Sequence, residues 1–538
     1  MSPSYAEACA RFSWPASLAA LGWRADGDVN LADTIAGRHA DSPALCWFGK
    51  YGSRRTLRFD ELAGLAGRVA GFLTARGVAK GDRVAGFLPR VPETLAIMLG
   101  TWKIGAVYVP IFTGFGADAV AFRVRHSGAR LLFTHREYRD RVPALSHGTT
   151  VVTLSAGAMR CPGDVDFEHA LAESGPPVAS VGCRRRDVAV LLYTSGSTGP
   201  PKGVQIATNF LLSVHPWITL GVDLHADDVF WPTGDPGWGY GLICYMAALA
   251  LGVSVTFQEA TPTAEQALAR MADAGVTNLA TTPTLLRAIM ALGAGRVGAY
   301  PTRLRRVSSC GEPLNPEVVR FFRTVWNVTV MDHYGASEFG LPIGNGAAID
   351  MPVKPGSMGR PLPGFRAAIV DDAGREVPAG VVGQIALERS ETGYYALGYW
   401  NDEERTRAVF GDRITIGDLG RRDDDGYFWF EGRADDVIKS AGYRIGPFEV
   451  ESAILQHPAV AEAAVVGIPD ELRGHIVKAF VVLRADATPS PALGDEIVQL
   501  VKQKVGGHQY PRALEFVRAL PRTETGKIQR FLLRKDPR

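Results

Sequence analysis

The sequence predicts an α/β protein in which helices cover parallel sheets, followed by a smaller domain with its own elements. Strand-like apolar runs at residues 83–88 and 106–111 flank a helical pattern at 93–102, and the same alternation recurs between 253 and 282. Alternation of this kind is typical of parallel strands joined by crossover helices. A chain of 538 residues, 46% of them apolar and 21% charged, is long enough for several globular domains.

In chain order, we expect strands at 83–88, 106–111 and 130–134 with a helix at 93–102, then a strand at 253–257, a helix at 263–274 and a strand at 277–282. These elements form two parallel-sheet α/β subdomains before residue 350. From 356 to 430 the pattern changes to short runs broken by Gly, Pro and Asp pairs, which indicates a small antiparallel β subdomain.

A sharper break comes at residues 431–436, Glu-Gly-Arg-Ala-Asp-Asp. The segment after it, about 100 residues, carries its own strands and helices and is long enough for an independent domain. The predicted division is therefore an N-terminal domain at 1–433, a hinge at 434–436 and a small α+β C-terminal domain at 437–538.

The bulk composition excludes several classes of protein. Lys and Arg number 58 against 56 Asp and Glu, so no overall field favours nucleic acid or an anionic membrane as partner. The 6 cysteines form no Cys-x-x-Cys pair, which argues against a zinc site and a disulfide framework and favours a cytoplasmic location. Residues 236–258 lack charge and are long enough to span a bilayer. Their glycines and a strand-like run divide them into a buried helix and a strand, so we expect no membrane span.

The most informative stretch is residues 194–203, Thr-Ser-Gly-Ser-Thr-Gly-Pro-Pro-Lys-Gly, which follows an apolar run at 187–193. Glycines let backbone N–H groups approach phosphate oxygens, hydroxyls add donors, and Lys202 supplies a mobile positive charge. A Walker loop is excluded, because Lys202 is followed by Gly203 rather than by Ser or Thr. We expect a phosphate site of another kind at the carboxyl end of a strand.

This loop resembles the signature of the adenylate-forming (AMP-binding) superfamily, which includes acyl-CoA synthetases, adenylation domains and luciferases. Four further segments between Trp231 and Lys527 match the same superfamily in order, and the resemblance covers nearly the whole chain. The motifs are most similar to those of short- and medium-chain acyl-CoA synthetases and acetyl-CoA synthetase-like enzymes. The resemblance implies a large N-terminal domain with a mobile C-terminal lid, and it puts Asp435 at the hinge between them.

By this resemblance, three segments contribute to a nucleoside site. In Ser-Cys-Gly-Glu-Pro-Leu-Asn-Pro at 309–316, Glu312 and its neighbours line the adenine, although on the residues alone Asn315 followed by a proline indicates a helix start. Tyr334 would stack on the adenine. Asp418 would accept hydrogen bonds from both ribose hydroxyls, a role suited to a carboxylate, and Ile416 beside it stands where relatives usually carry Thr.

The resemblance also implies a metal ligand. Glu338 takes the place of the superfamily's Mg²⁺ ligand, and Mg²⁺ binds few protein carboxylates alongside phosphate oxygens. The implied ATP- and AMP-binding residues are Thr194, Ser195, Gly196, Ser197, Thr198, Gly199, Lys202, Gly311, Glu312, Pro313, Asp332, His333, Tyr334, Gly335, Ala336, Asp418, Arg433 and Arg444.

The C-terminal domain carries two further motifs. Lys527 matches the adenylation lysine, whose charge stabilises the negative charge that develops at the α-phosphate. The segment 439–451 is similar to one that lines the pantetheine tunnel of medium-chain acyl-CoA synthetases. The implied catalytic residues are Lys527, Glu338 and Ser337, and the implied CoA-binding residues are Ser440, Ala441, Gly442, Tyr443, Arg473, Tyr510, Pro511 and Arg512.

For the acyl pocket the resemblance nominates Trp238, Gly239, Tyr240, Cys310 and Gly335. Acetate-specific relatives carry Trp at the position of Gly335, so glycine is expected to leave the pocket open. Each buried methylene contributes about 0.8 kcal/mol, roughly fourfold in affinity, which favours short-to-medium aliphatic acids over acetate. An aryl acid such as benzoate stays open as an alternative, because Trp238 and Tyr240 could stack on its ring.

The implied reaction joins a carboxylic acid to CoA through an acyl-adenylate, with ATP, Mg²⁺ and CoA as co-substrates and no tightly bound cofactor. Two alternatives are an adenylation enzyme that loads a carrier protein and a catalytically silent nucleotide-binding protein. The spacing around Lys527 also resembles a site acetylated in bacterial acyl-CoA synthetases, which implies a lysine acetyltransferase and a deacetylase as partners. A homo-oligomer and a monomer both stay open.

Overall fold

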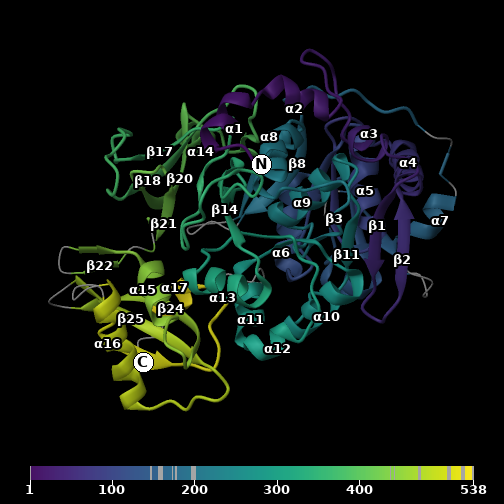
Figure 1. Cartoon of the computed structure of the whole chain (residues 1–538). Helices are drawn as coiled ribbons and strands as arrows, with labels where there is room; N and C mark the ends of the chain where they lie inside the picture. The colour runs from purple at the N-terminus through teal and green to yellow at the C-terminus, as the bar shows by residue number, and fades with distance from the viewer. Residues whose placement is uncertain are drawn as a thin grey trace.

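The computed structural model describes residues 2–145, 148–155, 161–172, 174–175, 178–194, 201–434, 436, 438–440, 443–470, 474–505, 510–522 and 528–535. Two large sheets and their helices form the body of the molecule. A small sheet lies beside them and consists of the strands β17 (Ala367–Val370), β18 (Gly383–Glu388), β20 (Arg413–Arg422) and β21 (Phe428–Arg433). The last part of the chain forms a separate lobe (Figure 1). This arrangement confirms the predicted α/β class with its two parallel-sheet units, small β unit and α+β C-terminal part.

One sheet has nine strands, and its middle strands run parallel. From β14 through β1 every neighbouring pair is parallel, whereas β2, β15 and β16 are antiparallel additions at the two edges. Strand β1 near the N-terminus pairs with β11, so a segment far away in the sequence extends this sheet at one side. The order is β16 (Arg360–Pro361), β15 (Gly340–Gly344), β14 (Val330–Ala336), β13 (Arg306–Cys310), β12 (Asn278–Thr281), β10 (Phe230–Pro232), β11 (Val255–Gln258), β1 (Pro43–Phe48) and β2 (Arg54–Arg58).

The other large sheet has eight strands and is parallel from β8 to β7. The phosphate-loop segment joins β8 to β9, which runs antiparallel to it. The order is β19 (Ala396–Tyr399), β9 (Lys202–Ala207), β8 (Val188–Thr194), β4 (Val107–Pro110), β3 (Arg83–Phe87), β5 (Leu131–His135), β6 (Thr150–Leu154) and β7 (Val165–Asp166).

The main hydrophobic core contains side chains of both large sheets together with those of α4, α5, α8 and α9. The charge-free stretch at 236–258 is divided into the buried helix α9 and the strand β11, as the sequence predicts. No helix in the described ranges is long and apolar enough to cross a membrane. The helices before the lid are α1 (Tyr5–Arg11), α2 (Trp14–Ala20), α3 (Leu31–Ala36), α4 (Phe59–Ala75), α5 (Pro92–Lys103), α6 (Ala117–Ser127), η1 (Arg136–Arg141), α7 (Phe167–Ala172), α8 (Phe210–Pro216), η2 (Trp217–Gly221), α9 (Gly239–Ala250), α10 (Ala264–Ala274), α11 (Pro283–Ala291), α12 (Ala294–Gly298), α13 (Pro316–Trp326) and α14 (Glu403–Val409).

The predicted antiparallel region at 356–430 is present but less self-contained than expected. Four strands form an antiparallel sheet in the order β17 (Ala367–Val370), β18 (Gly383–Glu388), β20 (Arg413–Arg422) and β21 (Phe428–Arg433). Two other strands of this region leave it, because β16 pairs with β15 in the nine-stranded sheet and β19 pairs with β9 in the eight-stranded sheet. The region 356–430 thus contributes one strand to each of the two large sheets.

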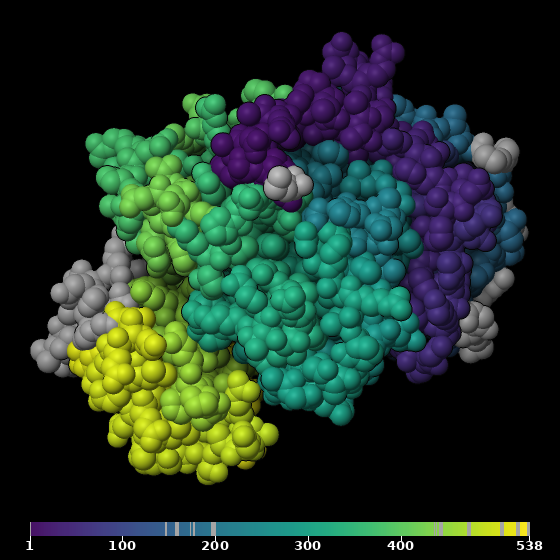
Figure 2. Space-filling view, in the orientation of Figure 1, coloured from purple at the N-terminus to yellow at the C-terminus, as the bar shows by residue number. Residues whose placement is uncertain are grey.

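The C-terminal lobe has its own small apolar cores, formed only by residues after 437. Figure 2 shows it as a protruding yellow lobe that touches the green and teal parts of the body. Its elements are β22 (Ile438–Ser440), β23 (Tyr443–Ile445), α15 (Pro447–Ile454), β24 (Val460–Asp470), β25 (Gly474–Leu483), α16 (Pro491–Val505), β26 (Ala513–Phe516) and α17 (Arg530–Lys535).

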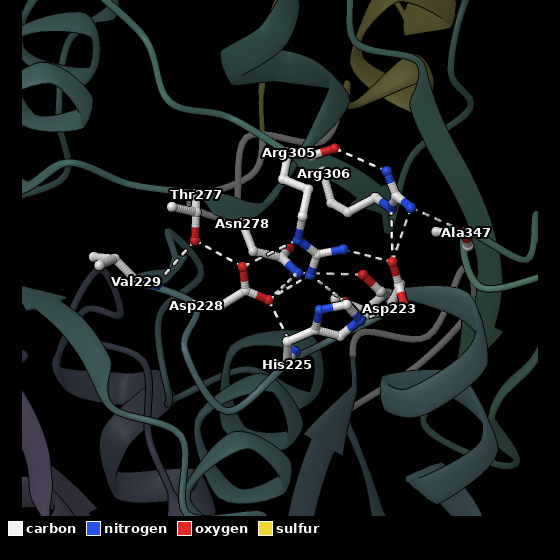
Figure 3. A network of polar contacts seen from close by, with 10 residues as sticks. Asp223, His225, Asp228, Val229, Thr277, Asn278, Arg305, Arg306 and Ala347 are labelled. Atoms are coloured by element: carbon white, nitrogen blue, oxygen red, sulfur yellow. Dashed lines mark hydrogen bonds and ion pairs between the residues drawn. The ribbon is translucent and has the colours of Figure 1, made fainter.

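A buried polar network fixes one end of the nine-stranded sheet (Figure 3). Arg305 donates to the Asp228 carboxylate at 2.6 Å, and Thr277 donates to the same carboxylate at 2.7 Å. Arg306 donates to Asp223 at 2.9 Å, while Asp223 holds a left-handed φ of 54° in the turn after η2. The network therefore ties the end of η2 to the starts of β12 and β13.

Candidate functional site

The predicted nucleotide-binding segments converge because they follow the carboxyl ends of neighbouring strands. Strand β13 ends at Cys310 and runs parallel to β14, with Cys310 opposite His333. In the other sheet, Thr194 at the end of β8 lies opposite Lys202 at the start of β9. Ends of parallel strands are where α/β proteins place ligands. Residues 195–199 of the loop, Ser195, Gly196, Ser197, Thr198 and Gly199, lie outside the described residues.

Asp418 is the centre of one polar cluster. The Tyr334 hydroxyl donates to Asp418 Oδ2 at 2.7 Å, and Arg433 Nη1 donates to Oδ1 at 2.8 Å. The antiparallel register of β20 and β21 sets Asp418 directly opposite Arg433. Each carboxylate oxygen has two lone pairs, so one on each oxygen is left for a further donor. The carboxylate is therefore arranged to accept two adjacent hydroxyl groups.

Glu338 lies just after β14 and is half-buried. Burial raises its pKa, although a hydrogen bond from Tyr399 and the charge of Lys202 act in the opposite direction. Tyr399 donates to Glu338 Oε1 at 2.8 Å. Burial and the charge of Arg405 lower the pKa of Lys202. A carboxylate and an ammonium group thus lie in the same half-buried region, as a metal–polyphosphate site requires.

The donor set at Glu338 fits Mg²⁺ that arrives with a triphosphate. Mg²⁺ keeps water and phosphate oxygens and takes only one or two protein carboxylates, so a single glutamate suffices. In the part of the chain that the structure describes, no group of three or more His, Cys, Asp or Glu could hold a metal ion. Ser337, the other predicted catalytic residue of this motif, is half-buried beside Gly239, whose Cβ, if it had one, would lie 3.9 Å from Ser337 Oγ.

The Glu312 carboxylate already has hydrogen-bond and ion-pair partners within the protein. Both of its carboxylate oxygens accept from Thr284 Oγ1 at 2.8 Å, and Arg287 lies 2.6 Å from Oε2. Gly311 before it has a φ of +93° with nothing within 4 Å of the place of a Cβ, so backbone here is open on one side. Pro313 follows in the same turn. Flat, open backbone of this kind can pack against a planar ring.

The segment after Glu312 reaches the lid. Helix α13 begins at Pro316 with Asn315 at the N-cap position, which confirms the predicted helix start. The Asn315 side chain makes no capping bond; instead its Nδ2 donates to Ser452 Oγ of α15 at 3.1 Å. Arg287 lies within reach of Asn315 Oδ1 at 3.4 Å as well. The cluster of Thr284, Arg287 and Glu312 is therefore connected through Asn315 to the C-terminal lobe.

The two residues before Tyr334, Asp332 and His333, are buried, and the His333 side chain contacts other parts of the protein. Trp217 Nε1 donates to His333 Nδ1 at 3.1 Å, so the proton of the neutral ring is on Nε2, which faces the Asn345 carbonyl at 3.1 Å. Burial lowers the pKa of His333 to about 4 and raises that of Asp332 well above its usual range. His333 thus anchors β14 as an uncharged residue behind Tyr334, with Ala336 ending the strand.

Aromatic rings surround the predicted acyl-pocket residues. Trp238 packs against Phe112 and Phe115 with ring centroids 5.5 and 5.6 Å apart. Tyr240 packs edge-on against Trp217 at 6.1 Å. The hydroxyl of Tyr240 and the Nε1 of Trp238 are buried without a hydrogen-bond partner among the described residues.

Gly335 has a role that the sequence did not show. A Cβ at this position would lie 2.1 Å from the Gly340 carbonyl oxygen and 2.6 Å from Leu341 Cδ2. The space that a side chain would enter is therefore filled by the start of β15. Glycine permits this close approach of β14 and β15, and Leu341 and the Gly340 backbone occupy the place where a side chain would lie. The buried Cys310, at the end of the neighbouring strand, lies on the same edge.

The predicted CoA-binding residues are only partly described. Ser440 is buried in β22 and pairs with Tyr443 of β23. Lys502 Nζ and Arg512 Cζ lie 4.4 and 4.7 Å from the centroid of the Tyr510 ring, just before Pro511. Ala441, Gly442, Arg473 and the side chains of Tyr443 and Arg444 lie outside the described residues. The lobe therefore presents two cations around one aromatic ring.

Lys527 and the hinge residue Asp435 also lie outside the described residues, but their neighbours are well connected. Arg522 and Ile528, on either side of the segment that contains Lys527, form a β-bridge. Arg530 lies 2.8 Å from Glu451 of α15, and Arg534 lies 2.5 Å from Asp436. The helix after Lys527 is thus tied to the chain at the predicted hinge.

Several side chains of the site were not predicted from the sequence. Tyr399, Thr284, Arg287 and Trp217 contact predicted site residues, yet each comes from a segment with no chemical motif of its own. The partners of Tyr399 and Trp217 are more than sixty residues away, so no local spacing could reveal them. Tertiary packing brings these pairs together, through contact of the two large sheets for Tyr399 and Glu338 and of η2 with β14 for Trp217 and His333.

Comparison with known proteins agrees with this geometry. The family model for the AMP-binding enzyme matches residues 32–400, and that for the AMP-binding enzyme C-terminal domain matches 449–527. An acetyl-coenzyme A synthetase of Bacillus subtilis (strain 168) is 36% identical, covering 99% of this chain and 94% of that protein.

Two solved structures show the same architecture. An acyl-CoA synthetase of Brucella canis is 39% identical, with a TM-score of 0.80 over 99% of this chain and 98% of that chain. A benzoate CoA ligase from Burkholderia xenovorans LB400 is 28% identical, with a TM-score of 0.84 over 94% of this chain and 100% of that chain. The resemblance inferred from the motifs is confirmed: the chain is an enzyme and belongs to the AMP-binding enzyme family.

Proposed function

We propose that this enzyme is an ATP-dependent acid–thiol ligase, which converts a carboxylic acid to an acyl-adenylate and then to an acyl-CoA. The observation that carries the proposal is the Asp418 cluster beside the half-buried Glu338 and Lys202. It combines an acceptor for two vicinal hydroxyls with a carboxylate and an ammonium group suited to metal and phosphate. A family that contains acyl-CoA synthetases supports the same assignment.

In the first half-reaction an oxygen of the substrate carboxylate attacks the α-phosphorus of ATP, the α–β phosphoanhydride bond breaks, and pyrophosphate leaves. Asp418 holds the ribose and Lys202 neutralises phosphate charge, while Glu338 would hold Mg²⁺, which would supply further positive charge for the triphosphate. Lys527 stabilises the charge that develops between the nucleophile and the α-phosphate. The carboxylate is already a nucleophile at neutral pH, so catalysis is chiefly positioning and charge stabilisation.

In the second half-reaction the sulfur of CoA attacks the acyl carbonyl, the thiol proton is lost to solvent, and AMP leaves. The N-terminal domain at 1–433 and the lid at 437–538 would change their relative orientation about residues 434–436 between the steps. Ser440 and the hairpin of β22 and β23 would line the path of the pantetheine. The cations around Tyr510 suit the phosphates of the CoA nucleotide.

The acid that we propose is a short-to-medium aliphatic one. Each additional buried methylene contributes about 0.8 kcal/mol, so several carbons outweigh most differences in polar contact. The aryl alternative keeps specific support, because Trp238 lies among Phe112 and Phe115 and a benzoate CoA ligase shares the fold. The close approach of β14 and β15 at Gly335 supports neither choice by itself, since Leu341 occupies the place of the missing side chain.

The remaining proposals concern the setting of the reaction. We place the enzyme in the cytoplasm, with ATP, Mg²⁺, CoA and a free acid as its small-molecule partners. Acetylation of Lys527 by a lysine acetyltransferase would remove the charge and stop adenylation, while thioester formation from supplied acyl-adenylate continues, and a deacetylase would reverse it. A homo-oligomer is compatible with this mechanism but not required by it.

The decisive experiment measures AMP formation with ATP, Mg²⁺ and CoA across acids from acetate to octanoate, plus benzoate. Lys527→Ala is the inactive variant, and Lys504→Ala, an exposed lysine of α16 in the same lobe, is the matched control. Turnover that depends on Lys527 and on CoA, with an optimum at about four to eight carbons, supports the proposal. Turnover without CoA points instead to a carrier protein as acceptor, and nucleotide binding without any turnover refutes the assignment.

A further inference from the structure

A hydrogen bond joins the two large sheets near Glu338, the predicted metal ligand. The Tyr399 hydroxyl, at the end of β19 in the eight-stranded sheet, donates to Oε1 of Glu338, which follows β14 of the nine-stranded sheet, at 2.8 Å. We propose that Tyr399 is a positioning residue that holds one oxygen of Glu338 so that the other faces Mg²⁺ and the triphosphate. This inference rests on the proposed function.

Tyr399 can serve as a rigid support because it is fixed on all sides. Its backbone N–H donates to Thr406 Oγ1 at 2.8 Å, and its carbonyl accepts from Gln205 Nε2 at 3.1 Å. Its ring packs edge-on against Phe410 at 5.6 Å, and only 4% of the residue is exposed. A hydroxyl anchored in this way fixes the direction of the carboxylate that it binds, as second-shell partners do for metal ligands.

The carboxylate needs such a support because a competing partner lies close by. Lys202 Nζ is 5.8 Å from the centroid of the Tyr399 ring. Burial raises the pKa of Glu338 and the charge of Lys202 acts to lower it, although no ion pair between the two side chains is present among the described residues. A Glu338 released from Tyr399 could rotate toward Lys202. The ammonium and the carboxylate would then neutralise each other instead of binding phosphate and metal. In this proposal Tyr399 keeps the Glu338 carboxylate available for the metal and the Lys202 ammonium group available for phosphate.

The test is Tyr399→Phe, which removes the hydroxyl and keeps the ring. Acid-dependent exchange of pyrophosphate into ATP is measured against Mg²⁺ concentration, and thioester formation from supplied acyl-adenylate and CoA is measured separately. We expect the half-saturating Mg²⁺ concentration to rise about 10-fold to 100-fold, with exchange largely restored at saturating Mg²⁺. Thioester formation should stay within about twofold of wild type, because it involves no triphosphate.

Tyr427→Phe is the matched control, since the buried Tyr427 hydroxyl also makes one short bond, to the Pro352 carbonyl at 2.6 Å, away from the site. It should leave the Mg²⁺ dependence unchanged. Thr406→Val, which removes the anchor of the Tyr399 backbone, should shift the Mg²⁺ dependence in the same direction but less. That second variant keeps the inference testable should Tyr399→Phe fail to fold.

An unchanged Mg²⁺ dependence in Tyr399→Phe overturns the inference. A Tyr399→Phe that loses both half-reactions equally, together with thermal stability, also overturns it, because a purely structural role predicts that pattern. These results are distinct from failure of the proposed function, which would appear as absence of acid-dependent exchange in the wild-type enzyme itself.

Discussion

Replacing Asp418 by Asn should weaken nucleotide binding far more than removing one of its protein partners. Both carboxylate oxygens already accept one donor, from Tyr334 at 2.7 Å and from Arg433 at 2.8 Å. The remaining lone pairs are those proposed for the two ribose hydroxyls. In Asp418→Asn one oxygen becomes an NH₂ group that accepts nothing, so one charge-assisted bond to the ligand is lost, which costs about 1.5–3 kcal/mol.

That cost corresponds to a rise of about 10-fold to 150-fold in the KM for ATP and in the Kd for AMP. Tyr334→Phe removes only a bond within the protein and leaves both ribose contacts, so its effect should stay below that of Asp418→Asn. The assays are pyrophosphate exchange against ATP concentration and calorimetric titration with AMP. Asp371→Asn is a suitable control, because Asp371 is likewise paired with an arginine, Arg375, at 2.8 Å but lies in an exposed turn.

Two results would refute this reasoning. The first is an Asp418→Asn enzyme whose KM for ATP stays within about threefold of wild type, which would mean that the carboxylate does not contact the ribose. The second is a larger effect in Tyr334→Phe than in Asp418→Asn, which would mean that the hydroxyl itself binds the nucleotide.

Three further predictions concern stability and specificity. Burial lowers the pKa of His333 to about 4 from an ordinary 6.5. Between pH 6.5 and pH 4 the imidazole therefore binds a proton in the unfolded chain but stays neutral in the folded protein. Stability should therefore be full above pH 6.5 and fall toward pH 4, and His333→Gln should reduce that loss by up to about 3 kcal/mol in denaturation series at pH 7.5, 5.5 and 4.5. Gly335→Ala forces a Cβ against the Gly340 carbonyl, so it should lower the free energy of unfolding by about 1–3 kcal/mol and narrow the range of accepted acids, whereas an unchanged melting temperature would show that the start of β15 yields freely. Arg530→Met removes the cationic partner of the buried Glu451 and should destabilise the C-terminal lobe by about 3–5 kcal/mol in denaturant unfolding; a loss below about 1 kcal/mol would show that the pair is solvated.

Much of the fold could be predicted because its strands and helices have local signals. The runs at 83–88 and 253–257 correspond to β3 and β11, and the helical pattern at 263–274 corresponds to α10. What local patterns could not supply is long-range pairing. Strand β1 joins β11, and β19 joins β9, because their apolar faces complete sheets whose other strands lie elsewhere in the chain.

The site divides in the same way. The opposition of Asp418 and Arg433 follows from one hairpin, in which Arg433 comes fifteen positions after Asp418, so a sequence pattern could give both. The partner of Glu338 could not be found in this way, because Tyr399 belongs to another sheet. The reason for glycine at position 335 could not be predicted from the sequence either, since Leu341 fills the space beside it only in the folded protein.

The anchoring of the segment around Lys527 has a mechanical consequence. Arg522 lies 2.7 Å from Glu462 of β24, and Gln529 N–H donates to the Pro521 carbonyl at 2.8 Å, so both ends of the segment are fastened to the lobe and to each other. Under the proposed mechanism, in which the lobe changes its orientation about residues 434–436, Arg522 and Gln529 would therefore move with the lobe as one body. A more viscous solvent should then slow the reorientation while leaving the chemical steps unchanged.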